Sequence, residues 1–116
     1  MKKNYRKMVR DAAEILMNMC VHVYFRNTEE HSFRFANNTA SHHSDYALNV
    51  SEVTPHSIRI VATDESFFHS YEVPMWSLSD SFIYQLWCTY EDEINLSLTD
   101  SAWKRFSEEL EKRSAE

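Results

Sequence analysis

Side chains that can bind a metal or act as nucleophiles are scattered along this chain of 116 residues. It contains two cysteines and six histidines; Cys20 and His22 lie two residues apart, and His42 directly precedes His43. A zinc site needs such ligands at recurring spacings, and the sequence has no CxxC, HxxxH or HxH pattern. We therefore expect no metal site and no cofactor, with the histidines distributed over strands and surface loops.

The two thiols are expected to be structural rather than catalytic. Cys20 ends one apolar helical stripe and Cys88 follows Trp87 in another, and a thiol buried in apolar surroundings is unreactive. Glycine is absent from the whole chain, which excludes glycine-rich phosphate loops, dinucleotide fingerprints and nucleophile elbows. We assign no catalytic residue. An enzyme with a site assembled from scattered histidines and carboxylates, metal-dependent or not, stays an alternative.

Length and composition predict one domain spanning residues 1–116. The chain is 43% hydrophobic and 14% aromatic, which is enough to build a core. No window reaches the length of about 18 apolar residues that a membrane span needs, and no signal peptide is evident. Two cysteines make no disulfide framework, so we expect a cytoplasmic protein with both thiols reduced.

Three segments have the apolar periodicity of helices. The first covers residues 1–20, the second begins near Ser77 or Ser79 and ends near Tyr90, and the third runs from about Asp100 to Arg113. The second is expected to stop at Tyr90 because three acidic residues follow it, and acids oppose the dipole at a helix C-terminus.

Five segments alternate apolar and polar residues, as half-buried strands do. The predicted strands are residues 21–26, 31–36, 45–53, 57–63 and 67–73. Short connections favour pairing of each strand with the next, which gives an antiparallel meander. A short sixth strand is predicted at 94–98. The expected fold is α+β, with an N-terminal helix, a sheet of about five strands, and two C-terminal helices packed on one face.

Some apolar side chains fall on the opposite face of this predicted sheet. They are His22, Tyr24, Val61 and Phe68. If they cluster, they form an apolar surface of the kind that pairs proteins. A structural module that forms a homodimer through this open face is therefore a second alternative.

Charge is distributed unevenly along the chain, whose net charge is −6. The first helix carries a basic face that includes Lys3, Arg6, Lys7 and Arg10, which we interpret as solvated, with a site for an acidic partner as the alternative. Residues 27–98 carry eleven acids against two arginines. Such a surface repels phosphate backbones, so direct nucleic-acid binding is not expected.

The acids in two predicted turns and at one predicted helix end are the candidate partner-binding residues. They are Glu29, Glu30, Asp64, Glu65, Glu91, Asp92 and Glu93. Acidic surfaces attract proteins with basic grooves and raise the rate of association. In an up-and-down meander the two turns lie at opposite ends of the sheet, so these acids are expected to be spread out.

These features predict a small acidic binding protein without enzymatic activity. In general character it is similar to phage and mobile-element inhibitors, such as anti-CRISPR and anti-restriction proteins. That likeness implies a basic, nucleic-acid-handling host protein as the partner. It rests on size, acidity and the lack of a catalytic signature, and it assigns no residue.

Overall fold

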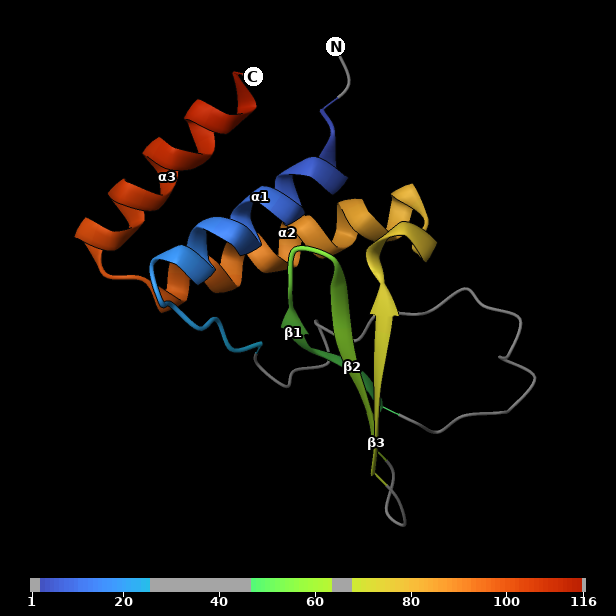
Figure 1. Cartoon of the computed structure of the whole chain (residues 1–116). Helices are drawn as coiled ribbons and strands as arrows, with labels where there is room; N and C mark the ends of the chain where they lie inside the picture. The colour runs from blue at the N-terminus through green and yellow to red at the C-terminus, as the bar shows by residue number, and fades with distance from the viewer. Residues whose placement is uncertain (1–2, 26–46, 64–67, 116) are drawn as a thin grey trace.

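The computed structural model describes residues 3–25, 47–63 and 68–115, which form a layer of helices and one sheet (Figure 1). In chain order the elements are α1 (Tyr5–Asn18), β1 (Ala47–Val53), β2 (Ser57–Thr63), β3 (Phe68–Pro74), a short 3-10 helix (Met75–Ser77), α2 (Asp80–Ser97) and α3 (Asp100–Ser114). One helix, an antiparallel sheet and two further helices confirm the predicted α+β class.

The described sheet is an antiparallel meander of three strands in the order β1-β2-β3. In its register Ile60 pairs with Val50 on one side and Tyr71 on the other, and a bulge interrupts β1 between Val50 and Glu52. The predicted strands at 45–53, 57–63 and 67–73 correspond to these three. The predicted strand at 31–36 lies outside the described residues, so a count of five strands is not confirmed.

Residues 21–25, predicted as the start of the first strand, are not part of the described sheet. Their alternation nevertheless serves packing, because Val21, Val23 and Phe25 lie against the core while His22 and Tyr24 are exposed. The Phe25 ring stacks on Tyr90 of α2 with centroids 5.7 Å apart. The period-two pattern therefore identified which side chains face inward, although these residues pair with none of the three described strands.

One hydrophobic core joins α1 and α2 to the inner face of the sheet. Its fully buried members include Val9, Ala12, Ile58, Ile83, Leu86 and Ile94. Burial of a large aliphatic side chain is worth about 1.5–3 kcal/mol, so this cluster outweighs local preferences at the element ends.

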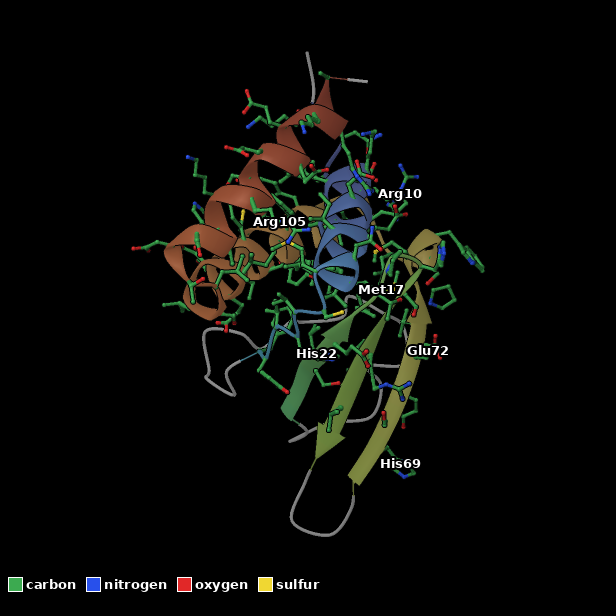
Figure 2. The ribbon with its side chains drawn as sticks, turned by 60° about the vertical axis from the view of Figure 1, so that its left-hand side comes forward. Arg10, Met17, His22, His69, Glu72 and Arg105 are labelled. Carbon is green, nitrogen blue, oxygen red and sulfur yellow. The ribbon has the colours of Figure 1, made fainter. Side chains whose placement is uncertain are left out.

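The third helix does not cover the sheet as predicted. It packs against α1, on the side away from the strands, so that α3, α1 and the sheet follow one another across the molecule (Figures 1 and 2). Of its apolar stripe only Phe106 is fully buried, whereas Trp103 and Leu110 are half-buried. Helix α1 therefore covers this stripe only in part.

The second helix is longer than predicted and continues to Ser97, so the predicted strand at 94–98 is wrong. Leu86, Tyr90 and Ile94 recur every four residues and are all buried, which continues the helical stripe past the acids. Thr99 caps α3 directly afterwards, accepting a hydrogen bond from the Ala102 amide at 3.3 Å.

The first helix ends in a left-handed residue that is not glycine. Cys20 has φ 57°, its amide bonds the Met17 carbonyl at 3.0 Å, and the Val21 amide bonds the Leu16 carbonyl at 2.9 Å. These two bonds define a Schellman motif, whose left-handed position is usually glycine. A chain without glycine therefore holds a cysteine in a conformation that costs it about 1 kcal/mol.

The outer face of the described sheet is polar. Arg59 lies 3.7 Å from the Glu52 carboxylate and donates to the Ser70 hydroxyl at 3.1 Å, and Ser57 donates to Glu72 at 2.9 Å. Val61 is half-buried there. Of the other apolar residues predicted for this face, His22 and Tyr24 belong to a segment outside the described sheet, and the Phe68 side chain lies outside the described residues.

Among residues 3–25, 47–63 and 68–115, no helix combines the length and apolarity needed to cross a membrane.

Candidate functional site

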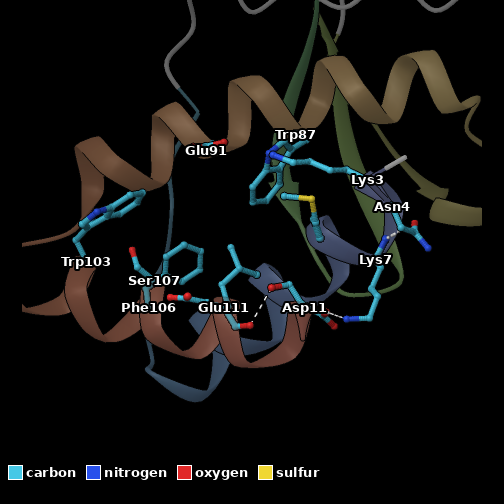
Figure 3. Close-up of a pocket in the computed structure, with 13 residues that line it drawn as sticks. Lys3, Asn4, Lys7, Asp11, Trp87, Glu91, Trp103, Phe106, Ser107 and Glu111 are labelled. Carbon is cyan, nitrogen blue, oxygen red and sulfur yellow. Dashed lines mark hydrogen bonds and ion pairs between the residues drawn. The ribbon is translucent and has the colours of Figure 1, made fainter. Parts of the chain in front are cut away.

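A groove of about 590 Å³ is bounded by the three described α-helices (Figure 3). Helix α1 packs against both α2 and α3, whereas those two have no comparable contact with each other. The apolar side chains that line the groove are Met8, Trp87, Trp103, Phe106 and Leu110. Its volume lies in the range typical of ligand sites, about 300–1,000 Å³.

Helical spacing brings these side chains to the groove. Trp103, Phe106 and Leu110 follow one another at three- and four-residue intervals on α3, and the Trp103 and Phe106 rings have centroids 5.7 Å apart. Trp87 reaches the groove from the buried stripe of α2. The sequence predicted each stripe as core, but the opening between them follows from how three helices pack.

A buried carboxylate fixes one end of the groove. The Asp11 side chain is 7% exposed; the Lys7 ammonium lies 2.7 Å from one of its oxygens, and the Arg113 guanidinium lies 3.7 Å from the other. Lys7 also donates to the backbone oxygen of Arg113 at 2.8 Å, and Arg113 contacts Glu14 at 2.6 Å. The hydrogen bond that Arg113 donates to Glu14 raises the pKa of Arg113. These contacts join the C-terminal turn of α3 to α1.

Among the described residues, the Lys7 ammonium bonds two groups of the protein. An ammonium has three N–H groups, and two of them bond Asp11 and the Arg113 carbonyl. The exposed Lys3 lines the same end of the groove. This end therefore favours a negatively charged group, or the carbonyls at a helix C-terminus.

Acids line the groove from two helices. Glu91 lies on α2 and Glu111 on α3, and both side chains are exposed. Glu91 is one of the predicted partner-binding residues, whereas sequence reasoning did not single out Glu111. Its position immediately after Leu110 of the apolar stripe is the signal that would have identified it.

The other predicted partner-binding residues have different outcomes. Asp92 is exposed beside Glu91 on α2, but Glu93 is only 2% exposed and therefore offers no surface to a partner in this conformation. Helical geometry explains the difference, because Glu93 lies on the same side of α2 as the buried Tyr90 and Ile94. The remaining four, at 29–30 and 64–65, lie outside the described residues.

The basic residues of α1 act partly within the fold, which corrects their interpretation as a solvated face. Arg6 donates to the backbone oxygens of Met75 and of Leu78, the latter at 2.8 Å, and pairs with Asp80 at 2.9 Å. It therefore attaches α1 to the segment that leads into α2. Lys7 is held by Asp11 and the Arg113 backbone, as described above.

A second hollow, of about 330 Å³, is lined by basic side chains and by no acid among the described residues. Arg6, Arg10, His56 and Trp76 line it, and Trp76 is 82% exposed. Among the described residues, Arg10 pairs with Asp11, at 3.5 Å. The hollow is shallow and basic, and its best-placed cation, Arg6, already bonds three groups of the protein.

Both thiols are exposed, contrary to the prediction that they are buried. Cys20 is exposed because it lies past the last turn of α1, and Cys88 because it lies on the outer side of α2, near the Tyr84 phenol. Hydrogen bonding to the Cys88 side chain raises the pKa of Tyr84. Within the described part of the chain, no three His, Cys, Asp or Glu side chains come together as metal ligands.

Comparison with protein-family models, curated proteins and solved structures found no significant match for this chain. Functional inference therefore depends on the groove, the charges around it and the exposed side of α2.

Proposed function

We propose that this chain is a non-enzymatic binding protein that docks on a basic surface of another protein through the exposed side of α2. The observation that supports this most strongly is the position of Glu91 and Asp92. Both acids are exposed on α2, and Glu91 also lines the apolar groove. An acidic side chain beside concave apolar surface combines electrostatic attraction with area for burial.

Large exposed side chains flank the two acids along α2. Tyr84 is 49% exposed and Leu96 is 59% exposed. Helical spacing brings Tyr84, Cys88, Glu91 and Asp92 to one side of α2. We name the side formed by Tyr84, Cys88, Glu91, Asp92 and Leu96 the α2 face.

Tyrosine at the centre of an interface contributes strongly to affinity. Charges at its rim mainly set the association rate and its dependence on salt. The α2 face offers both, which supports a role in binding a protein. The outer face of the sheet is a weaker candidate for binding a protein, because its described polar side chains pair with each other.

The partner that fits this face has a basic groove or ridge. A net charge of −6 repels nucleic acid itself and attracts proteins that bind it. We propose that the partner is a nucleic-acid-handling protein and that this chain occupies its basic site, as an inhibitor of the phage or mobile-element type would. The argument for this class of partner is the complementarity between an acidic chain and a basic site.

The proposal is tested by affinity capture from bacterial lysate with tagged protein at low and high salt. Wild-type protein is compared with Glu91→Lys on the α2 face and Glu108→Lys on the exposed outer side of α3. Both variants change the net charge by the same amount. We expect a basic protein captured by wild type and by Glu108→Lys, released at high salt, and depleted with Glu91→Lys. Equal capture by all three proteins would contradict docking through α2.

A further inference from the structure

We infer that the groove between α2 and α3 binds a basic amphipathic helix of the partner, with the C-terminal end of that helix at Lys3 and Lys7. This inference rests on the proposed function and specifies which element of the partner is recognised. It follows from three features of the groove: its apolar lining, its acidic walls and its basic end.

The first feature is an open position beside three packed helices. Because α1 contacts both α2 and α3 while those two lie apart, the groove has the place of a fourth helix in a bundle. Its lining includes Trp87 from α2, Met8 from α1 and Leu110 from α3. An amphipathic helix presents apolar residues at three- and four-residue spacing, which matches a groove lined along its length in this way.

The second feature is the sign of charge on the walls. Glu91 on α2 and Glu111 on α3 both line the groove, and both are exposed. Lysine or arginine residues flanking the apolar stripe of a docked helix would therefore meet a carboxylate on either side. Asp11 does not add to this attraction, because Lys7 and Arg113 already pair with it.

The third feature sets the direction of the docked helix. Lys3 and Lys7 line one end, Asn4 caps the start of α1 there, and the described contacts of Lys7 use two of its three N–H groups. The last carbonyls of a helix are unsatisfied and carry about half a negative charge. A C-terminus at this end accepts from Lys7 and faces the positive end of the α1 dipole. An N-terminus there would be repelled.

The direct test uses a synthetic Leu/Lys peptide of about 18 residues, or five helical turns, with one apolar stripe. Its control is a peptide of the same composition whose order destroys the stripe. Binding to the full chain is measured by calorimetry. We expect the amphipathic peptide to bind at least about tenfold more tightly than the scrambled one, because only it can bury a continuous apolar face. Equal affinities would overturn the inference.

A variant that fills the groove tests the location. Ser107 lines the groove and Ser101 lies on an exposed turn of the same helix, so Ser107→Trp and Ser101→Trp make a matched pair. We expect Ser107→Trp to weaken peptide binding by about tenfold or more and Ser101→Trp to leave it unchanged. Circular dichroism and thermal unfolding check that both variants fold. Unchanged binding by a folded Ser107→Trp would overturn the location.

The charge variants separate this inference from the proposed function. If Glu91→Lys weakens capture of the partner while Ser107→Trp does not, docking on α2 stands and the groove is not the site. If neither variant weakens capture, the proposed function fails as well. If both variants weaken capture of the partner, the proposed function and the groove as its site are both supported.

Cross-linking tests the direction of the helix. Ser114 lines the basic end, so Ser114→Cys is made in a chain with Cys20→Ser and Cys88→Ser, which removes the exposed native thiols. The amphipathic peptide carries one cysteine, at its N-terminus or at its C-terminus. We expect a disulfide with the C-terminal cysteine. Preferential cross-linking of the N-terminal cysteine would reverse the assignment.

Discussion

The Lys7 ammonium lies 2.7 Å from the Asp11 carboxylate one turn further along α1, at the end of the groove where the last turn of α3 is attached. Asp11 is 5% exposed, and its other oxygen faces Arg113 of α3 at 3.7 Å. Arg10 lies 3.5 Å from that same oxygen, so one buried acid organises three cations from two helices. These contacts attach the last turn of α3 to α1 at this end of the groove.

Asp11→Asn is expected to destabilise the protein by about 2 kcal/mol, because it removes a nearly buried charge and takes the carboxylate partner from Lys7, while Arg113 keeps Glu14. Urea denaturation followed by circular dichroism measures the change. Asp92→Asn is the control, because Asp92 is exposed on α2 and its loss should cost no more than about 0.5 kcal/mol. Equal effects of the two substitutions would show that the network does not support the fold.

Cys20→Gly is expected to stabilise the protein by about 0.5–1 kcal/mol. Glycine adopts the left-handed conformation at φ 57° without steric cost, and that gain exceeds its greater loss of entropy. Cys20→Val at the same exposed position should destabilise, because branching at Cβ makes positive φ harder to adopt. Thermal unfolding of both variants measures the difference. A valine variant as stable as the glycine variant would contradict the Schellman motif.

Because the Tyr90 phenol is buried, we expect the free energy of unfolding to fall in alkali. Burial raises its pKa, so the native state keeps the phenol proton at pH values where the unfolded state, with a pKa of about 10, loses it. The unfolded state then binds fewer protons than the native state. This contribution is fully present below pH of about 10 and is lost above it, by up to about 1.4 kcal/mol per pH unit.

The difference between wild type and Tyr90→Phe isolates this effect from other groups that titrate in alkali. We expect the phenylalanine variant to lose stability less steeply above pH of about 10. Tyr24→Phe, at a 76% exposed position, controls for loss of a phenol. Parallel stability curves for wild type and Tyr90→Phe would show that the phenol is not buried in the native state.

Local sequence patterns predicted which helices and strands form more accurately than they predicted where each one ends. The strand at 57–63 and the helix at 100–113 agree with β2 and α3 to within one residue. The end of α2 was missed because an acidic helix terminus costs only about 0.3–1 kcal/mol. Burial of Ile94 is worth about 1.5–3 kcal/mol, so the helix continues through its acids.

The candidate site was predicted only in part. Glu91 and Asp92 were identified from their charge, but Glu93 was included because charge alone does not reveal which side of a helix a residue occupies. The groove was missed because Trp87 and Trp103 each lie on a stripe that is typical of a core. Which part of a stripe stays uncovered depends on how α2 and α3 pack against α1, and no local pattern encodes that.

The measurement that tests the central claim most directly is the affinity of the purified chain for its captured partner. Calorimetry compares wild type, the double variant Glu91→Lys with Asp92→Lys, and Glu108→Lys. Docking through the α2 face predicts at least about a tenfold loss for the double variant and less than about a twofold loss for Glu108→Lys. Similar affinities for all three proteins, or equal losses in both variants, would contradict the claim.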